Sequence, residues 1–209
     1  MSEVYSLTHD RAAALEAAAE HLGEGGLAVF PTDTIYGVGC DAFNRLATER
    51  IFEVKRRPRK MPLPVLVSRP RQAWALCAEV PNAAAELAAA FWPGGLTLIL
   101  PAADGLSLDL GETSGRIAVR MPDNEDLIEL IASVGPLAAT SANVSGSPTP
   151  LTIAEIRAQL GDGVDIYLDG GPSTADVASS IVDVTRRRPK VVREGAVPSA
   201  AIDRVLSEA

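Results

Sequence analysis

Short apolar runs alternate along this chain with longer segments whose apolar residues recur at helical spacing. The apolar runs predict strands at 27–30, 64–67, 96–100, 116–120, 137–140, 164–168, 180–184 and 191–193. The longer segments predict helices at 9–23, 46–56, 69–79, 82–92, 124–134, 152–160 and 198–207. Because the two kinds of segment interleave without a strict βαβ rhythm, we expect an α/β or α+β fold with a twisted mixed β-sheet flanked by helices.

Composition narrows the class of protein. A chain of 209 residues can bury a substantial core, and we expect one domain over residues 1–209. The formal net charge of −8 argues against broad binding to nucleic acid or to anionic membrane, although a local basic patch could bind a nucleotide. The chain begins without the basic start and apolar run of a signal peptide and contains no apolar run of about 20 residues, so a cytoplasmic location is expected.

A hydroxyl-rich, glycine-punctuated segment follows the first predicted strand. Thr32, Thr34 and Tyr36 alternate, which would place them on one side of an extended segment, either as contacts to a small amino acid or as residues facing solvent at a strand end. The next residues, 37–42, match the relaxed dinucleotide fingerprint G-x-G-x-x-[GA], but a proline and polar residues separate them from the strand. We therefore expect these residues to form a loop.

A group of cations closes the second predicted helix. Lys55 and Arg57 would point to different sides of an ideal helix, but Pro58 pushes Arg57 out of the helical region, so that the two side chains can converge. They either complement the helix dipole or bind an anion. A third polar group, Ser141 and Asn143 with Ser145, follows a predicted strand; it is either a turn or a binding loop.

These motifs resemble those of the YrdC-type threonylcarbamoyl-AMP synthase family, and the chain resembles the short, single-domain form of that family. The matching segments are Pro31-Thr32-x-Thr34-x-Tyr36-Gly37, Lys55-x-Arg57, Phe91-Trp92-Pro93-Gly94, Ala118-Val119-Arg120 and Ser141-Ala142-Asn143-x-Ser145-Gly146. Their order and separation match from about residue 27 to residue 195. One such motif alone is weak evidence, whereas five in order are strong evidence.

The resemblance implies a nucleotidyltransferase that condenses L-threonine, bicarbonate and ATP to threonylcarbamoyl-AMP and pyrophosphate. The product would pass to a transferase that makes threonylcarbamoyladenosine in tRNA, and direct binding to tRNA would be weak. The cofactor would be Mg²⁺, held mainly by the ATP phosphates; no side chain is assigned as a metal ligand, and Ser141 and Asn143 would contact the phosphates or the bound metal.

The resemblance also assigns residues to roles. The catalytic residues would be Lys55, Arg57, Ser141 and Asn143; the threonine contacts Thr34, Arg120, Ala139 and Ser179; and the ATP contacts Lys55, Arg57, Ser141, Asn143, Thr149 and Arg193. The loop 57–64 is the expected lid over the site. The chain departs from the family where Leu66 replaces a frequent histidine that would contact threonine, which leaves strictness for threonine over serine open.

Two other functions stay open. One is carbamoyl-adenylate chemistry of the hydrogenase-maturation type, which would use carbamoyl phosphate in place of threonine. The other is a non-catalytic RNA-binding module, which the net charge of −8 disfavours.

Overall fold

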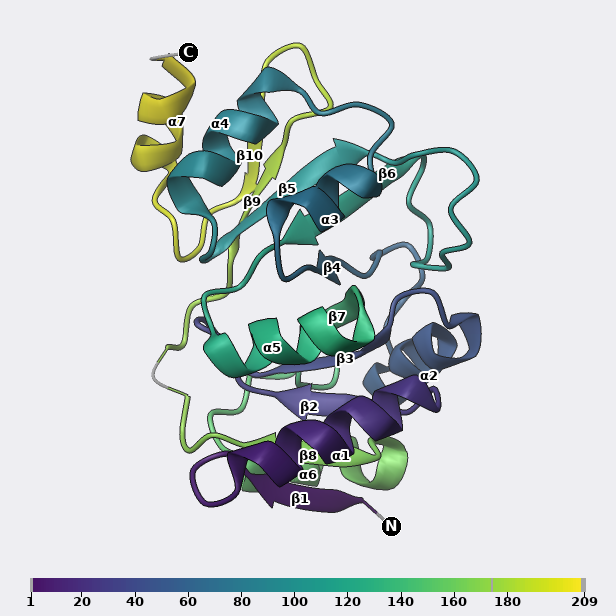
Figure 1. Ribbon diagram of the computed structural model, residues 1–209. Helices are drawn as coiled ribbons and strands as arrows, with labels where there is room; N and C mark the ends of the chain where they lie inside the picture. Colours follow the sequence, from purple (N-terminus) through teal and green to yellow (C-terminus); the bar gives the residue numbers. More distant parts are fainter. Residues whose placement is uncertain (1, 174, 208–209) are drawn as a thin grey trace.

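The computed structural model describes residues 2–173 and 175–207. All strands within these residues belong to one long, twisted sheet (Figure 1). Within these residues the strand order is β1-β8-β2-β3-β7-β4-β6-β5-β9-β10. The strands are β1 (Glu3–Ser6), β2 (Ala28–Phe30), β3 (Gly37–Asp41), β4 (Val65–Leu66), β5 (Leu96–Pro101), β6 (Arg116–Arg120), β7 (Leu137–Ser141), β8 (Ile166–Asp169), β9 (Ser180–Asp183) and β10 (Lys190–Arg193). The predicted mixed sheet is confirmed, because four strand pairs are parallel (β1/β8, β2/β8, β4/β6 and β5/β9) and the others are antiparallel.

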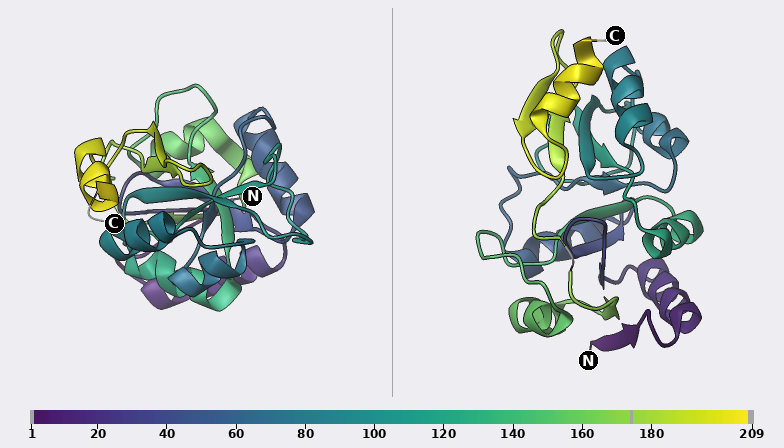
Figure 2. Two further views of the ribbon diagram at one scale, coloured as in Figure 1. Left: turned by 90° about the horizontal axis from the view of Figure 1, so that it is seen from above. Right: turned by 90° about the vertical axis from the view of Figure 1, so that its left-hand side faces the viewer.

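The helices gather around the two ends of the sheet (Figure 1). They are α1 (Arg11–Gly23), α2 (Arg45–Lys55), α3 (Pro70–Ala75), α4 (Asn82–Phe91), α5 (Glu125–Val134), α6 (Ile153–Leu160) and α7 (Ser199–Ser207), with a 3₁₀ turn at Gly161–Gly163. Helices α3, α4 and α7 lie at one end, and α1, α2, α5 and α6 at the other. The side view in Figure 2 shows α1 and α6 on opposite sides of the strands near the N-terminus.

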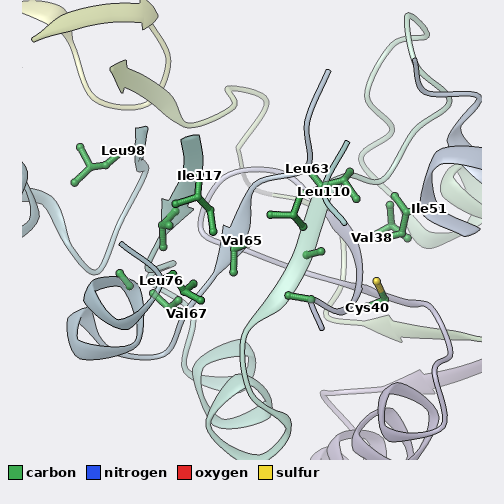
Figure 3. Close-up of a cluster of buried hydrophobic side chains, with 14 of the residues drawn as sticks. Val38, Cys40, Ile51, Leu63, Val65, Val67, Leu76, Leu98, Leu110 and Ile117 are labelled. Atoms are coloured by element: carbon green, nitrogen blue, oxygen red, sulfur yellow. The ribbon is translucent and has the colours of Figure 1, made fainter. Parts of the chain in front are cut away.

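The apolar faces of these elements form the core. Figure 3 shows part of it, a single buried cluster that extends from Ile117 of β6 through Val65 of β4 to Val38 and Cys40 of β3. A second cluster lies under α1 and α5, where buried leucines of both helices meet strands β2, β7 and β8. Burial of apolar area is the main favourable term in folding, at roughly 25 cal/mol per Å². These two clusters therefore fix the positions of the strands that carry the polar residues described below.

The sequence analysis did not predict two of the strands, β1 and β3. Residues 37–41 were expected to form a loop but are β3, a central strand paired antiparallel with β2 and with β7. Its glycines are required by close packing: a Cβ at Gly37 would lie 2.8 Å from the Phe30 ring, and one at Gly39 would lie 2.9 Å from the Ala138 carbonyl oxygen. The strand β1 was missed because it is a short edge strand with exposed or half-exposed residues and no apolar run.

Two helix ends also differ from the prediction. Helix α2 ends at Lys55, and Arg56 takes a left-handed conformation with a φ of 50°. The amide of Arg57 then donates to the Phe52 carbonyl at 2.8 Å, and that of Arg56 to the Glu53 carbonyl at 3.0 Å. This is a Schellman motif, so the chain turns at Arg56 and not at the residue before Pro58.

Helix α3 ends at Ala75, four residues before the predicted end. The chain leaves the helix because the next residues pair with the end of β5: Cys77 forms an isolated bridge with Ala102, and the amide of Ala78 donates to the Pro101 carbonyl at 3.0 Å. The capping box predicted for α6 is present between Thr152 and Glu155. None of the helices within residues 2–173 and 175–207 is both long and apolar enough to cross a membrane.

Candidate active site

A large cavity lies against strands β4, β5, β6, β7, β9 and β10, and its volume is about 1020 Å³. Along β6, Arg116, Ala118 and Arg120 alternate onto the same face, and all three line the cavity. Ala118 pairs with Ile99 of β5, and Ile99 pairs with Asp183 of β9, so neighbouring strands contribute to the same wall. Among its described lining residues are eight lysines or arginines and two carboxylates, so the cavity is cationic within a chain of net charge −8.

Every residue that the sequence assigned to the site lines this one cavity. They are Thr34, Lys55, Arg57, Arg120, Ala139, Ser141, Asn143, Thr149, Ser179 and Arg193. They come from β6, β7 and β10, from the end of α2, and from the loops after β2, after β7 and before β9. The placement brings them together, whereas their individual roles stay predictions.

Lys55 is a buried cation held by backbone oxygens. Its side chain is about 1% exposed, and its Nζ donates to the carbonyls of Ser141 and Asn143 and, at 3.4 Å, to the Asn143 side-chain Oδ1. Burial, with a smaller contribution from the nearby charge of Arg57, lowers the pKa of Lys55 to about 7. No carboxylate within the described residues forms an ion pair with Lys55, so its charge is solvated by dipoles and remains uncompensated.

The loop after β7 is fixed around Lys55. Ser141 Oγ donates to Asn143 Oδ1 at 2.6 Å, and Asn143 Nδ2 donates to the Ser147 carbonyl at 2.8 Å. The amide of Ser145 donates to the Lys55 carbonyl at 2.9 Å. These hydrogen bonds preorganise the loop, and the role of Ser141 and Asn143 in binding stays a prediction.

The guanidinium of Arg57 forms hydrogen bonds to the backbone of the loop that follows it. Its Nε donates to the Met61 carbonyl at 2.7 Å and its Nη2 to the Pro62 carbonyl at 3.0 Å. Desolvation, and then the charge of Arg193, lower the pKa of Arg57. Arg57 thus folds the loop 57–64 over its own guanidinium, while the lid function of that loop remains a prediction.

Arg193 meets the predicted threonine contact Ser179. Its Nε and Nη2 donate to the Ser179 carbonyl at 3.0 and 2.7 Å, and its Nη2 also approaches Ser179 Oγ at 3.2 Å. The buried hydroxyl of Thr97 on β5 lies 2.8 Å from Ser179 Oγ. Thr97 lines the cavity and was not predicted; its signal was a lone hydroxyl inside an otherwise apolar strand.

Arg120 is a second buried cation of the cavity. Its guanidinium donates through Nε to the Gly94 carbonyl at 3.0 Å, through Nη1 to Thr34 Oγ1 at 2.9 Å, and through Nη2 to Asp33 at 2.5 Å. Burial lowers the pKa of Arg120, and the charge and hydrogen bond of Asp33 act in the opposite direction. The sequence prediction named Arg120 and Thr34 but passed over Asp33 between Thr32 and Thr34.

The segment predicted to be extended is bent, although Thr32, Thr34 and Tyr36 all line the cavity and the hydroxyls of Thr32 and Thr34 lie 3.0 Å apart. Residues 33–35 form a bend, and Thr32 Oγ1 donates to the Ile35 carbonyl at 2.8 Å. The hydroxyl of Tyr36 donates to the Gly171 carbonyl at 2.6 Å and accepts from the Gly170 amide at 3.1 Å. Local hydrogen bonds therefore stabilise a bend in place of the extended conformation. Of Thr32, Thr34 and Tyr36, only Thr34 accepts a hydrogen bond from Arg120 within the described residues.

Asp183 and Ser145 are two further cavity residues that the sequence did not assign. Asp183 is almost fully buried and pairs with Arg186 at 3.0 Å and with Arg116 at 3.6 Å, so it holds two of the cations that line the cavity. Ser145 Oγ is buried, and within the described residues it has no hydrogen-bond partner. Ser145 could have been selected, because it continues the alternation of Ser141 and Asn143.

Comparison with known proteins identifies the family to which this chain belongs. Residues 20–195 match the family model of the Sua5, YciO and YrdC proteins, which is described as telomere recombination. The chain belongs to the Sua5/YciO/YrdC family. This confirms the resemblance that the motifs indicated.

The relatives within the Sua5/YciO/YrdC family carry consistent names. A Mycobacterium leprae protein, provisionally named a threonylcarbamoyl-AMP synthase, is 43% identical over 99% of this chain and 94% of its own length. The threonylcarbamoyl-AMP synthase of Pyrococcus abyssi is 38% identical over 91% of this chain. The structure of P. abyssi Sua5 complexed with L-threonine superimposes with a TM-score of 0.87 at 36% identity over 93% of this chain. The chain spans 56% and 57% of those two P. abyssi sequences.

Proposed function

We propose that this chain is a threonylcarbamoyl-AMP synthase, a nucleotidyltransferase that joins L-threonine, bicarbonate and ATP for threonylcarbamoyladenosine formation in tRNA. The observation that carries the proposal is that one cavity contains both Lys55, Arg57 and Arg193, which form no ion pair within the described residues, and Arg120, which is paired with Asp33. Polyphosphate suits the first three cations, and the carboxylate of an amino acid suits Arg120. The names of the relatives support the same reaction.

The chemistry requires two anions to meet. The threonine amine takes up carbon dioxide from bicarbonate, with loss of water, to form a carbamate. A carbamate oxygen then attacks the α-phosphorus of ATP, and the bond from that phosphorus to the bridging oxygen breaks, so that pyrophosphate leaves with the electron pair.

The residues of the cavity would align these anions and offset their charge. Lys55 and Arg57 place positive charge beside the phosphates, where it also stabilises the departing pyrophosphate. Arg120 and Thr34 would hold the amino acid, so that the carbamate reaches the α-phosphate in line. Alignment of this kind contributes about 7–11 kcal/mol to catalysis, so the proposed mechanism does not depend on a histidine base.

Magnesium would arrive with the nucleotide. No group of three or more His, Cys, Asp or Glu side chains suited to a metal occurs among residues 2–173 and 175–207. The oxygens near Lys55 are neutral hydroxyl, amide and carbonyl groups, which fit a cation already chelated by phosphates. Bound Mg²⁺ would supply charge neutralisation of the phosphates, and Ser141 and Asn143 would be the residues that contact it.

Mass spectrometry of the reaction products tests the proposal. The protein is incubated with ATP, Mg²⁺ and bicarbonate, and with threonine, serine or carbamoyl phosphate in separate reactions. We expect pyrophosphate and an adenylate that require both threonine and bicarbonate. An adenylate formed only from carbamoyl phosphate, or nucleotide binding with no adenylate in any reaction, would contradict the proposal. The reaction with serine measures how strictly the site selects threonine.

A further inference from the structure

Asp33 is the carboxylate that pairs with Arg120, a predicted amino-acid contact, yet it is not among the described residues that line the cavity. Its side chain is about 15% exposed and pairs with that of Arg120, which is about 8% exposed. The two groups are 2.5 Å apart between Asp33 Oδ1 and Arg120 Nη2. Asp33 therefore contacts Arg120 but is absent from the residues that a ligand in the cavity would touch.

The donors of Arg120 can be accounted for one by one. A guanidinium has five N–H groups, and Arg120 uses three of them on Gly94, Thr34 and Asp33. One N–H on Nη1 and one on Nη2 are left. Two N–H groups on a rigid fork match the two oxygens of a carboxylate, provided that the plane of the fork is fixed.

Asp33 supplies this fixation. The Gly94 carbonyl and the Thr34 hydroxyl are neutral acceptors, whereas Asp33 is charged and forms the strongest of the three contacts. Asp33 also lies in the bend of residues 33–35, which is closed by the hydrogen bond from Thr32 Oγ1 to the Ile35 carbonyl at 2.8 Å. The same bend places Thr34 Oγ1 on Nη1 of Arg120 at 2.9 Å. Asp33 and Thr34 thus orient the guanidinium from one rigid turn.

We propose that Asp33 is a positioning residue that fixes the plane of Arg120, so that its two remaining N–H groups receive the carboxylate of the amino-acid substrate. This inference rests on the proposed function. Asp33 touches no substrate atom and acts through Arg120. The ion pair of Asp33 and Arg120 is neutral overall, so the site recognises an α-carboxylate by the orientation of the free N–H groups of Arg120.

Asp33→Asn tests this role because asparagine keeps the size of the side chain and removes its charge. We expect the KM for threonine to rise about tenfold or more, which is within the range of coupling between contacting charged groups, while kcat and the KM for ATP change less than about twofold. Asp33→Glu should recover part of the loss because it restores the charge. Asp123→Asn is the matched control, since Asp123 is exposed and follows β6 by only three residues.

Calorimetry separates this role from a merely structural one. L-threonine and L-threoninol, which lacks the carboxylate, are titrated into the wild-type and Asp33→Asn proteins. The substitution should weaken binding of threonine and leave that of threoninol unchanged. In an Arg120→Gln background, Asp33→Asn should cause no further loss, because its effect passes through Arg120.

Each result is decisive. Equal weakening of threonine and threoninol, or full additivity with Arg120→Gln, would overturn the positioning role. Unchanged threonine binding in Asp33→Asn, with normal binding in the wild type, would overturn this inference alone. A wild-type protein that neither binds threonine nor forms the adenylate would overturn the proposed function and the inference together. If Asp33→Asn does not fold, the same comparison is made with Asp33→Glu, for which a displaced carboxylate predicts a selective rise in the KM for threonine.

Discussion

Lys55 and Arg120 are buried cations of the same cavity, but the protein compensates their charges differently. Lys55 is surrounded by two backbone carbonyls and an amide oxygen, whereas Arg120 is paired with the carboxylate of Asp33. Dipoles orient around a cation but leave its net charge in place, while an ion pair is neutral overall. The Lys55 region is therefore suited to attract a highly charged anion, and the Arg120 region to recognise the shape of a carboxylate.

Removal of the lysine should have the largest effect. Lys55→Ala is expected to lower kcat/KM for ATP by about 100-fold or more, the range found for loss of a single preorganised transition-state contact. The fold should persist, because the substitution removes a buried charge that lacks a carboxylate partner. Product formation is measured by mass spectrometry and folding by circular dichroism.

The control for Lys55→Ala is Arg71→Ala, which removes an exposed cation from α3, outside the cavity. Its turnover should match that of the wild type. Near wild-type turnover in Lys55→Ala would contradict both the role of Lys55 and the contrast with Arg120.

The pH dependence should show that the charge of Lys55 weakens the fold and supports the reaction. The folded pKa is about 7 and the ordinary value is 10.5. Between these values the unfolded chain binds a proton that the folded chain does not, so the free energy of unfolding of the apoprotein should rise as the pH increases from 7 towards 10. Over the same range kcat/KM for ATP should fall, by about tenfold for each pH unit once the lysine is largely neutral.

Lys55→Met isolates this titration from all others. Chemical unfolding at pH 6 and pH 9 should give a smaller gain in unfolding free energy for the variant than for the wild type, since each pKa unit corresponds to about 1.4 kcal/mol. An equal gain in both proteins would show that Lys55 keeps its proton. In that case the carbonyl hydrogen bonds would outweigh the cost of burial.

Salt should have the smallest effect and should separate the two regions. From about 50 to 300 mM salt the KM for ATP is expected to rise a few-fold, since screening weakens the attraction of the net cationic region for polyphosphate. The KM for threonine should stay nearly constant, because Arg120 and Asp33 form a neutral pair. Steady-state kinetics with each substrate varied in turn measures both values, and equal salt dependence would remove the distinction.

The sequence predicted the type of fold and the location of most site residues because both depend on local patterns. Apolar runs identified the buried strands, and the capping box located the start of α6. Strand β3 was missed because its glycines look like a loop in the sequence, and only packing against Phe30 and Ala138 shows why side chains are excluded there.

The same limit explains the site residues that were missed. Asp33 and Thr97 contact Arg120 and Ser179 across long sequence separations, so no local spacing reveals them. The bend at 33–35 depends on a side-chain hydrogen bond from Thr32, which overrides the alternation expected of an extended segment. Sequence patterns therefore located the residues of the site, and tertiary contacts determined which of them can act as pairs.

The strand order of the sheet also has a consequence for how the protein folds. The parallel partners β5 and β9 are more than 80 residues apart, as in the pair of Leu96 with Ser180, and β1 pairs with β8 through Glu3 and Ile166. Such long-range pairing slows folding, because large loops must close before their contacts form. Since Thr34, Lys55, Arg120, Ser141 and Arg193 come from five separate parts of the chain, the cavity can assemble only late, when the last strands have joined. Recovery of ATP binding during refolding should therefore report completion of the whole sheet.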